Sequence, residues 1–439
     1  MATRDLAANN LATRLLSRPW TEEAIALEIK MALESTHGRT RRALVARLFA
    51  LGSGAYPPSP HALTAFLISS PYFKPPQRSA AAAVLDSPMF APAAPFIGLP
   101  IPALVTLGEL AEWVGLSLDQ LDGLAGVRQG HSRTVEPTLQ HYRYGFIDKS
   151  GGKSRLIEAP KPRLKAIQRQ ILREILAPVP VHPCAKGFVA GRSCMSGAQV
   201  HASEAVVATF DLAQFFPSIS LARIHGIFRC FGYPWIVSRR LAGLCTTTTP
   251  PGIFRRIPEV RRPDTHEQAL FRVPHLPQGA PTSPALANLP AYKVDLRLHG
   301  LARAAGANYT RYADDLAFSG DAGFADALDR FGISIERILK EEGFALNPTK
   351  TRIMSRGQRQ RVTGIVVNEH CNVGRAEFDA LKAILFNSAR SGPAGQNRAG
   401  APDFRAHLAG RVSWVEQVNP ARGAKLRQLF DQIEWATSV

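Results

Sequence analysis

The sequence predicts a protein of the α+β class. Three stretches have the β-branched and aromatic content of strands and lie far apart in the chain: residues 142–159, 206–211 and 308–319. Apolar residues recur at helical spacing in 164–176 and 328–342, and 375–439 reads as three further helices around a glycine-rich loop. No internal repeat or heptad run is present, so we expect a fold that mixes helices with a sheet.

The first hundred residues predict helices followed by an irregular segment. Thr21 is a candidate N-cap, and a second helix is expected from Arg41 to Leu51. Residues 57–102 are rich in proline and alanine, which favours a linker or an irregular wrap. We therefore expect a helical N-terminal extension over 1–75 and a linker over 76–105.

Residues 106–121 have the pattern of two short helices joined at Gly115, with Ser117 capping the second. This is the pattern of a helix-turn-helix. Asp119 and Asp122 on the second helix would repel phosphate, so we expect these helices to pack within the protein rather than to read DNA.

The overall charge favours a polyanionic partner. The formal net charge is +18 over 439 residues, which points to nucleic acid, whereas the alternative is a solvated basic surface. The five cysteines form no C-x-x-C pair and are odd in number, which argues against a zinc site or a disulfide framework and fits a reducing cytoplasm. No uninterrupted span of about 20 apolar residues occurs, so no membrane helix is expected.

Two adjacent acids, Asp314 and Asp315, lie between strand-like flanks in Tyr312-Ala313-Asp314-Asp315. A hairpin turn there would hold both carboxylates at the edge of a sheet. Taken alone the pair is weak evidence, because acids are common in turns. A third acid, Asp211, ends the strand-like stretch 206–210 far upstream, and a folded sheet could bring it beside the pair. Several carboxylates at one point suit hard divalent cations.

Two further segments fit phosphoryl transfer. Two metal ions about 4 Å apart can activate a hydroxyl and stabilise a leaving oxygen. A basic strand-turn-strand carrying Lys149, Lys153 and Arg155 would neutralise a triphosphate. In the segment Leu276–Pro284, Gly279 beside Gln278 would allow close approach of a substrate to the backbone.

This ordered set resembles reverse transcriptases, and within them the bacterial retron enzymes. The motifs that carry the resemblance, in chain order, are GGKSRLIEAPKPRLKAIQRQIL, AKGFVAGRSCMSGAQVH, FDLAQFFPSI, LPQGAPTSPALANL, RYADDLAFSG and GFALNPTKTRIM. Val362-Thr363-Gly364 matches a motif typical of retron enzymes, and the tail from His407 resembles their thumb. One position departs from the pattern, because Gly197 stands where an Asn-Ala-x-x-His motif has asparagine, which puts an RNA contact in doubt.

The resemblance implies a right-hand polymerase: fingers, a palm with an antiparallel sheet backed by helices, and a helical thumb. Fingers and palm would occupy 106–368 and the thumb 369–439. The reaction would be RNA-directed DNA synthesis from deoxynucleoside triphosphates, with two Mg²⁺ ions, for which Mn²⁺ is a possible substitute. Partners would be a structured non-coding RNA, its branched RNA–DNA product and an effector or toxin protein in antiphage defence.

The resemblance also assigns roles to single residues. It makes Asp211, Asp314 and Asp315 the metal ligands and Lys350 an acid that protonates pyrophosphate. The expected nucleotide-binding residues are Lys149, Arg155, Phe216, Gln278 and Gly279, and the expected RNA- or primer-binding residues are His201, Val362, Thr363 and Gly364.

Each of these roles has a structural alternative. The basic hairpin could be merely solvated, and Lys350 could be an ordinary surface lysine. Phe216 could be a core side chain, as we expect of its neighbour Phe215. His201 could be a satisfied structural histidine, and the Val-Thr-Gly segment could be a plain buried strand.

Three alternative functions stay open. A non-retron defence reverse transcriptase could make DNA without a linked RNA. A group II intron maturase would share the palm, but its C-terminal DNA-binding and endonuclease segments have no evident room here. An RNA-binding scaffold with an inactive polymerase fold is the non-enzyme alternative, and the intact acids argue against it.

Overall fold

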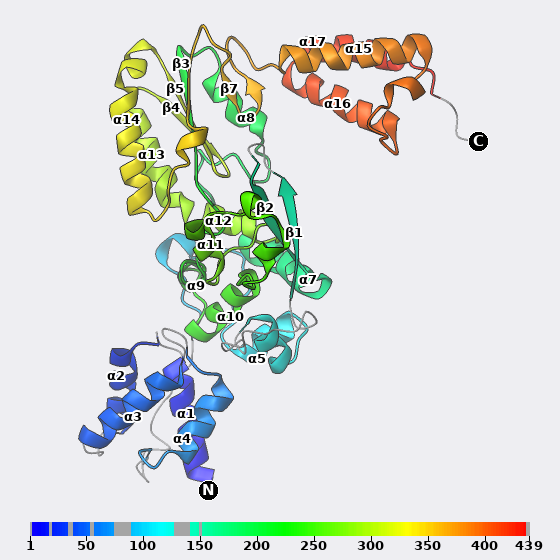
Figure 1. Cartoon of the computed structure of the whole chain (residues 1–439). Helices are drawn as coiled ribbons and strands as arrows, with labels where there is room; N and C mark the ends of the chain where they lie inside the picture. The colour runs from blue at the N-terminus through cyan, green and yellow to red at the C-terminus, as the bar shows by residue number, and fades with distance from the viewer. Residues whose placement is uncertain are drawn as a thin grey trace. The chain divides into compact units, whose positions relative to one another are not determined.

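The computed structural model describes residues 2–16, 20–33, 38–52, 57–73, 89–126, 141–148 and 152–435 (Figure 1). They fall into two compact units. Unit 1 consists of Met1–Pro180 and Phe216–Ala287, and unit 2 consists of Val181–Phe215 and Asn288–Val439. Each unit contains helices and antiparallel strands, so the predicted α+β class is confirmed.

Unit 1 begins with four helices, which are α1 (Ala2–Leu16), α2 (Glu22–Ala32), α3 (Gly38–Leu51) and α4 (Pro60–Ser69). Thr21 caps α2 as predicted, since its hydroxyl accepts a hydrogen bond from the Ala24 backbone N–H at 3.2 Å. The expectation of an irregular segment is wrong for α4. Ser59 caps this helix and Pro60 occupies its first position, where proline is favoured.

Residues 89–105 form the irregular wrap that the composition predicts. The backbone N–H groups of Ala91 and Ala93 donate to the carbonyls of Gly232 and Cys230, at 3.0 and 2.9 Å. The helices α5 (Leu107–Trp113) and α6 (Leu118–Leu124) follow, each started by a capping box.

The packing role expected for these two helices is confirmed. On α5, the Trp113 indole N–H donates to Glu174 at 2.9 Å. On α6, Asp122 accepts from the buried Arg240 guanidinium at 2.9 Å.

The basic strand-turn-strand exists as β1 (Tyr142–Asp148) and β2 (Ser154–Pro160), paired from Tyr142 opposite Pro160 to Asp148 opposite Ser154. The predicted helix after it is α7 (Pro162–Ile171), which continues as a π-helical turn over Leu172–Leu176.

The other α-helices of unit 1 are α9 (Leu221–Cys230), α10 (Trp235–Cys245) and α11 (Thr265–Phe271). Asp264 starts α11 with a capping box. A short helix, α12 (Ser283–Asn288), ends at the boundary with unit 2.

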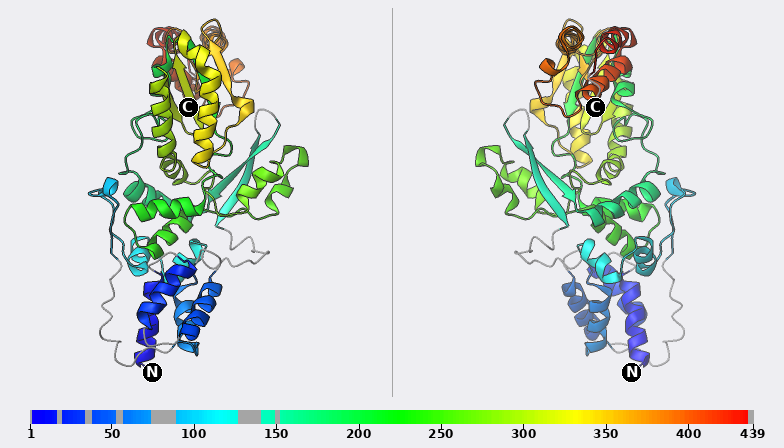
Figure 2. Two further views of the ribbon diagram at one scale, coloured as in Figure 1. Left: turned by 90° about the vertical axis from the view of Figure 1, so that its left-hand side faces the viewer. Right: turned by 90° about the vertical axis from the view of Figure 1, so that its right-hand side faces the viewer.

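Unit 2 is built on a four-stranded antiparallel sheet of order β4-β5-β3-β6. Its strands are β3 (Val206–Asp211), β4 (Asn308–Tyr312), β5 (Asp315–Gly320) and β6 (Arg352–Ser355). The helices α13 (Ala291–Ala304) and α14 (Ala322–Glu341) pack against β4, β5 and β3 (Figures 1 and 2). Phe331 of α14 meets Phe318 of β5 edge to face, with ring centroids 5.1 Å apart. The sheet is therefore backed by two helices, which fixes the strand ends that carry the acids.

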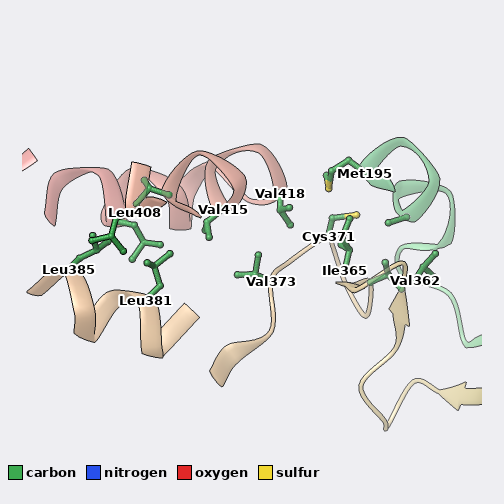
Figure 3. Packing of buried hydrophobic residues seen from close by; sticks show 14 of the residues in the cluster. Met195, Val362, Ile365, Cys371, Val373, Leu381, Leu385, Leu408, Val415 and Val418 are labelled. Atoms are coloured by element: carbon green, nitrogen blue, oxygen red, sulfur yellow. The ribbon is translucent and has the colours of Figure 1, made fainter. Parts of the chain in front are cut away.

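A large apolar cluster forms a second part of unit 2. It joins α8 (Cys194–Ala198) and the hairpin β7 (Arg361–Val362) and β8 (Ile365–Val366) to the three predicted C-terminal helices. These helices are α15 (Arg375–Ser391), α16 (Phe404–Val418) and α17 (Pro420–Asp431). Figure 3 shows the cluster running from Met195 through Cys371 and Val373 to Leu385 and Leu408. Within the described residues, no helix is both long and apolar enough to cross a membrane.

Candidate active site

The Asp-Asp pair lies in the turn between β4 and β5, as predicted. Ala313 holds the turn with a φ of +57°, which is unusual for a residue other than glycine. Asp315 is the register partner of Asp211 at the end of β3, and the Leu212 N–H donates to the Asp314 carbonyl at 2.9 Å. Because β3 and β5 are antiparallel, the end of one lies beside the start of the other. The sheet thus brings Asp211, Asp314 and Asp315 to one edge.

The negative charges of the three acids repel one another at this edge, and one lysine lies among them. Burial, followed by the negative charges of Asp314 and Asp211, raises the pKa of Asp315 to about 6, while the charge of Lys350 acts in the opposite direction. The Lys350 ammonium donates to the Asp211 carboxylate at 2.7 Å, and the Asn347 amide donates to the same group at 3.2 Å. The site therefore carries three carboxylates, and one lysine neutralises only part of their negative charge.

Such a donor set fits a divalent cation, because carboxylate oxygens are the ligands that hard cations prefer and a cation would relieve the repulsion. Across the described ranges, no three side chains of His, Cys, Asp or Glu form a closed metal-binding cluster. Asp211 and Asp314 nevertheless lie close enough to Asp315 to raise its pKa, and Lys350 supplies the nearby positive charge.

A buried ion pair supports the turn that carries Asp314. Arg311 of β4 and Asp295 of α13 are fully buried and joined by two parallel hydrogen bonds of 2.7 Å. The remaining Arg311 nitrogen donates to the Ala313 carbonyl and to Asn288, both at 3.0 Å. Tyr309 donates its hydroxyl proton to Asp295 at 2.8 Å. The network therefore holds the carbonyl of the residue that gives the turn its shape.

A tight backbone approach supports the same turn. A Cβ on Gly187 would lie 2.7 Å from the Ala313 nitrogen, so only glycine fits there. The Asn288 amide donates to the Gly187 carbonyl at 3.1 Å. Sequence reasoning missed Arg311, Asp295, Asn288 and Gly187. The signal that could have found Arg311 is a charged residue inside a predicted strand, directly before the Tyr-Ala-Asp-Asp motif.

In unit 1, Phe216 and Gly279 line one cavity of about 370 Å³, together with Lys165 and Arg169 of α7. Gly279 has a φ of +128°, and a Cβ there would lie 3.1 Å from the Glu158 carbonyl oxygen. The glycine is therefore required by contact with β2. Phe215 is buried, as expected of a core residue, whereas Phe216 is half-buried.

The loop that carries Gln278 rests on a buried polar network that sequence reasoning missed. The Glu158 N–H donates to the Gln278 carbonyl at 2.8 Å. The Glu158 carboxylate is 2.9 Å from His275 and accepts a hydrogen bond from Thr249 at 2.6 Å. His275 and Glu158 are both fully buried. The network fixes β2 to the loop.

The remaining predicted nucleotide-binding residues belong to the basic hairpin. Arg155 is half-buried on β2. Lys153 lies 3.5 Å from Glu267 and 3.8 Å from Asp264, so its charge is shared with two acids. Lys149 lies outside the described residues.

The structure argues against direct RNA binding by His201. Its ring is fully buried, with one nitrogen 2.8 Å from the Ser319 hydroxyl and the other 2.7 Å from the Thr310 hydroxyl. Burial, followed by the charge of Lys186, lowers its pKa to about 4, so the ring is neutral. His201 is the structural histidine that the sequence left as the alternative. Val362 ends β7, and Thr363 and Gly364 form the turn before β8. All three residues line a second cavity beside the Asp-Asp hairpin.

Residues 147–375 match the family model described as "Reverse transcriptase (RNA-dependent DNA polymerase)". The chain therefore belongs to the reverse transcriptase family.

Within that family the chain is of the bacterial retron type. Retron Mx65 reverse transcriptase of Myxococcus xanthus is 42% identical over 292 residues, which cover 66% of this chain and 64% of that protein. Retron Mx162 reverse transcriptase of the same species is 34% identical, covering 75% and 67% of the two chains. Retron Ec86 reverse transcriptase of Escherichia coli is 31% identical, covering 56% and 69%.

The match thus spans about two thirds of the length of these relatives. Among solved structures, a foamy viral protease-reverse transcriptase in complex with double-stranded DNA matches with a TM-score of 0.32 at 14% identity. That match covers 68% of this chain and 44% of the other.

Proposed function

We propose that this chain is the RNA-directed DNA polymerase of a retron and copies a structured partner RNA into single-stranded DNA that stays linked to the RNA. The observation that carries the proposal is the meeting of Asp211, Asp314 and Asp315 at one edge of the unit 2 sheet. The substrates would be deoxynucleoside triphosphates, and the growing strand would be held by the basic surface. A role in antiphage defence, with an effector or toxin protein, belongs to the same proposal.

Each residue has a proposed task. Asp211, Asp314 and Asp315 would hold two Mg²⁺ ions, or Mn²⁺ in their place, which when bound would activate the primer hydroxyl and stabilise the leaving pyrophosphate. Lys350, already bonded to Asp211, would provide a proton near the leaving group. Arg311 would keep the turn in the shape that aims both acids at the same point.

Unit 1 would receive the nucleotide. Phe216 lines the cavity with Gly279 and would exclude a 2′-hydroxyl by its bulk, which favours deoxynucleotides. Gln278, whose backbone is anchored to Glu158, would contact the incoming nucleotide, and Lys149 and Arg155 would meet its triphosphate. In right-hand terms, we propose fingers and palm over 106–368 and a thumb over 369–439, after an extension over 1–75 and a linker over 76–105.

The retron part of the proposal is tested on nucleic acid that copurifies with the full-length chain. Treatment with RNase and with a debranching enzyme should each change the mobility of the DNA, because the DNA is joined to RNA through a branch. DNA whose electrophoretic mobility changes with neither enzyme would contradict the retron proposal and favour an unlinked product. Absence of DNA, together with no synthesis on a primed RNA template, would favour an RNA-binding scaffold.

A further inference from the structure

Glu158 and His275, the buried polar pair of unit 1, share a proton. The His275 Nδ1 lies 2.8 Å from the Val273 carbonyl oxygen, which can only accept a hydrogen bond, so Nδ1 carries a proton. The Nε2 of the same ring lies 2.9 Å from the Glu158 carboxylate. Two lone pairs would repel each other at that distance, so a second proton lies between Nε2 and the carboxylate oxygen. Whether the imidazole or the carboxyl group holds this proton, it joins the two side chains.

The second oxygen of the Glu158 carboxylate is paired as well. Thr249 donates its hydroxyl to this oxygen at 2.6 Å. The Phe271 ring meets the His275 imidazole edge to face, with ring centroids 5.2 Å apart. Glu158, His275 and Thr249 are all buried. A buried polar network in which every member is paired is rigid, whereas the removal of one member leaves another buried group without its partner.

Backbone hydrogen bonds connect the pair to the loop that carries Gln278. The Glu158 N–H donates to the Gln278 carbonyl at 2.8 Å, so Glu158 holds the loop through its backbone and, by way of His275, through its side chain. His275 exchanges two backbone hydrogen bonds of 2.9 Å with Thr247. Because the main chain of His275 is fixed in this way, the hydrogen bond of its ring to Glu158 fixes the loop against β2.

The same loop is tied to the turn that follows Phe216. The Leu276 N–H donates to the Ile219 carbonyl at 3.0 Å, and the Ile219 N–H donates to the Phe216 carbonyl at 3.1 Å. Phe216 and Gly279 line the same cavity of about 370 Å³. A shift of the loop away from β2 would therefore change the shape of this cavity at both residues.

Stability alone does not explain a polar pair at this place. Apolar residues of similar size often stabilise a protein as much as a buried ion pair does, or more. A hydrogen bond, unlike an apolar contact, fixes both the distance and the direction between the two groups that it joins. The pair therefore fixes where the Gln278 loop lies on β2, which points to a role in positioning.

We infer that Glu158 and His275 are positioning residues for the incoming deoxynucleotide, and that their shared proton holds the Gln278 loop and the cavity at Phe216 in the form that binds it. Neither side chain touches the substrate, because both are fully buried. The inference rests on the proposed function, since it names what fixes the nucleotide site of unit 1. Nucleotide affinity, rather than strand binding or the rate of the chemical step, depends on the pair.

The test compares His275→Asn with His275→Gln in the full-length chain. The Gln amide reaches the position of Nε2 and can donate to Glu158, whereas the shorter Asn amide reaches only the position of Nδ1 and leaves the carboxylate buried without this partner. We expect His275→Asn to raise the KM for deoxynucleotide about tenfold and to leave kcat and the KM for a primed RNA template within about twofold of the wild type. His275→Gln should keep the wild-type KM. The matched control is His266→Asn, an exposed histidine on α11, which should change neither constant.

A merely structural role would give a different pattern. A lowered melting temperature of His275→Asn with a wild-type KM for deoxynucleotide would overturn the inference. An equal rise in the KM for the primed template would also contradict it, because the pair would then act on the whole unit and not on the nucleotide site.

Glu158 provides independent variants. The amide of Glu158→Gln can donate to a neutral imidazole and accept from Thr249, so this variant should keep the wild-type KM for deoxynucleotide. Glu158→Leu leaves the imidazole and the threonine hydroxyl unpaired and should raise that KM as His275→Asn does. Thr249→Val removes a single hydrogen bond and should raise it severalfold, which keeps the test decisive if the other variants do not fold. The same KM in all these variants would contradict the inference.

Hydrogen exchange measures the position of the loop without any enzymatic reaction. We expect the backbone N–H groups of residues 275–279 to exchange faster in His275→Asn than in the wild type and in His275→Gln, while those of α14 exchange equally in all three. Unchanged exchange in the loop would overturn the inference, even if the variant lost activity. A wild-type chain that makes no DNA would instead contradict the proposed function, and the exchange comparison would still decide the positioning role.

Discussion

At the scale of residues, the site depends on a buried charge pair that touches no substrate. Arg311 carries five N–H donors in a fixed fork, and the structure pairs them with Asp295, Asn288 and the Ala313 carbonyl. Removing one partner of a buried pair leaves the other charge uncompensated. The resulting loss of stability is much larger than the net stabilisation that the ion pair provides over apolar residues of similar size.

Replacing Asp295 by Asn should therefore destabilise the protein. The Asn side chain has nearly the same shape but leaves the Arg311 charge buried without a counter-charge, so we expect the free energy of unfolding to fall by about 3–5 kcal/mol. Urea denaturation of the full-length chain measures this. Asp329→Asn, an exposed acid on α14, is the control and should change the value by less than about 0.5 kcal/mol. A similar small change in both variants would mean that the pair does not brace the turn.

Asp315 should make the stability of the metal-free protein depend on pH. Its pKa in the folded chain is raised to about 6, mainly by burial and then by Asp314 and Asp211, whereas an unfolded aspartate titrates near 3.9. The folded state thus binds the proton more tightly. Its contribution to stability is complete below about pH 4 and is lost as the pH rises through about 6.

We expect the melting temperature in a chelating buffer to reflect this loss between about pH 4 and 6, and Asp315→Asn to remove that part of the decline. Adding Mg²⁺ should raise the melting temperature of the wild type above pH 6, where the carboxylates are charged. An unchanged pH profile in Asp315→Asn would show that Asp315 does not titrate in this range.

At the scale of elements, local patterns predicted the helix caps and the hairpin and missed the contacts between distant segments. Thr21 and Ser117 cap helices as expected, because capping depends on neighbouring residues alone. The Asp-Asp hairpin follows from flanking strand residues in the same way. Glu158 and His275 meet across a long stretch of chain, and nothing near either residue indicates the other. The helix α4 was missed because proline was interpreted as a breaker, although it favours the first helical position.

Close approach of the segment before α8 to the turn gives a prediction at this scale. In Gly187→Ala, the new Cβ would lie 2.7 Å from the Ala313 nitrogen, so the turn must shift. We expect the polymerisation rate to fall on the order of a hundredfold, since small displacements of reacting groups are costly. The matched control is Gly300→Ala on α13, where nothing lies within 4 Å of the added Cβ. Equal rates in the two variants would show that the turn tolerates the shift.

At the scale of the whole molecule, the +18 charge and the family assignment point the same way. The sequence predicted the α+β class from local strand and helix patterns. It predicted the three acids from motifs that occur in a recognisable order along the chain. The sequence did not predict the division into these two units, since each unit is assembled from two segments that residues of the other unit separate along the chain. Strand pairing over such distances depends on tertiary packing and not on local preference.

Binding of an RNA–DNA hybrid should weaken steeply with salt. A basic protein that neutralises six to ten phosphates loses about a thousandfold or more in affinity between roughly 50 and 200 mM salt. We expect a loss of that order for this chain, measured by fluorescence anisotropy on a labelled hybrid. If the affinity for the hybrid hardly changed with salt concentration, the basic surface would be solvated and would not hold the strand.

The central claim is that Asp211, Asp314 and Asp315 form the polymerising centre of a reverse transcriptase. Its most direct measurement is DNA synthesis on a primed RNA template by the Asp314→Asn, Asp315→Asn double variant, with Asp329→Asn as the control. We predict that the double variant binds the primed template at least as tightly as the wild type and makes no detectable DNA, while the control does both normally. Synthesis by the double variant at the wild-type rate would contradict the claim.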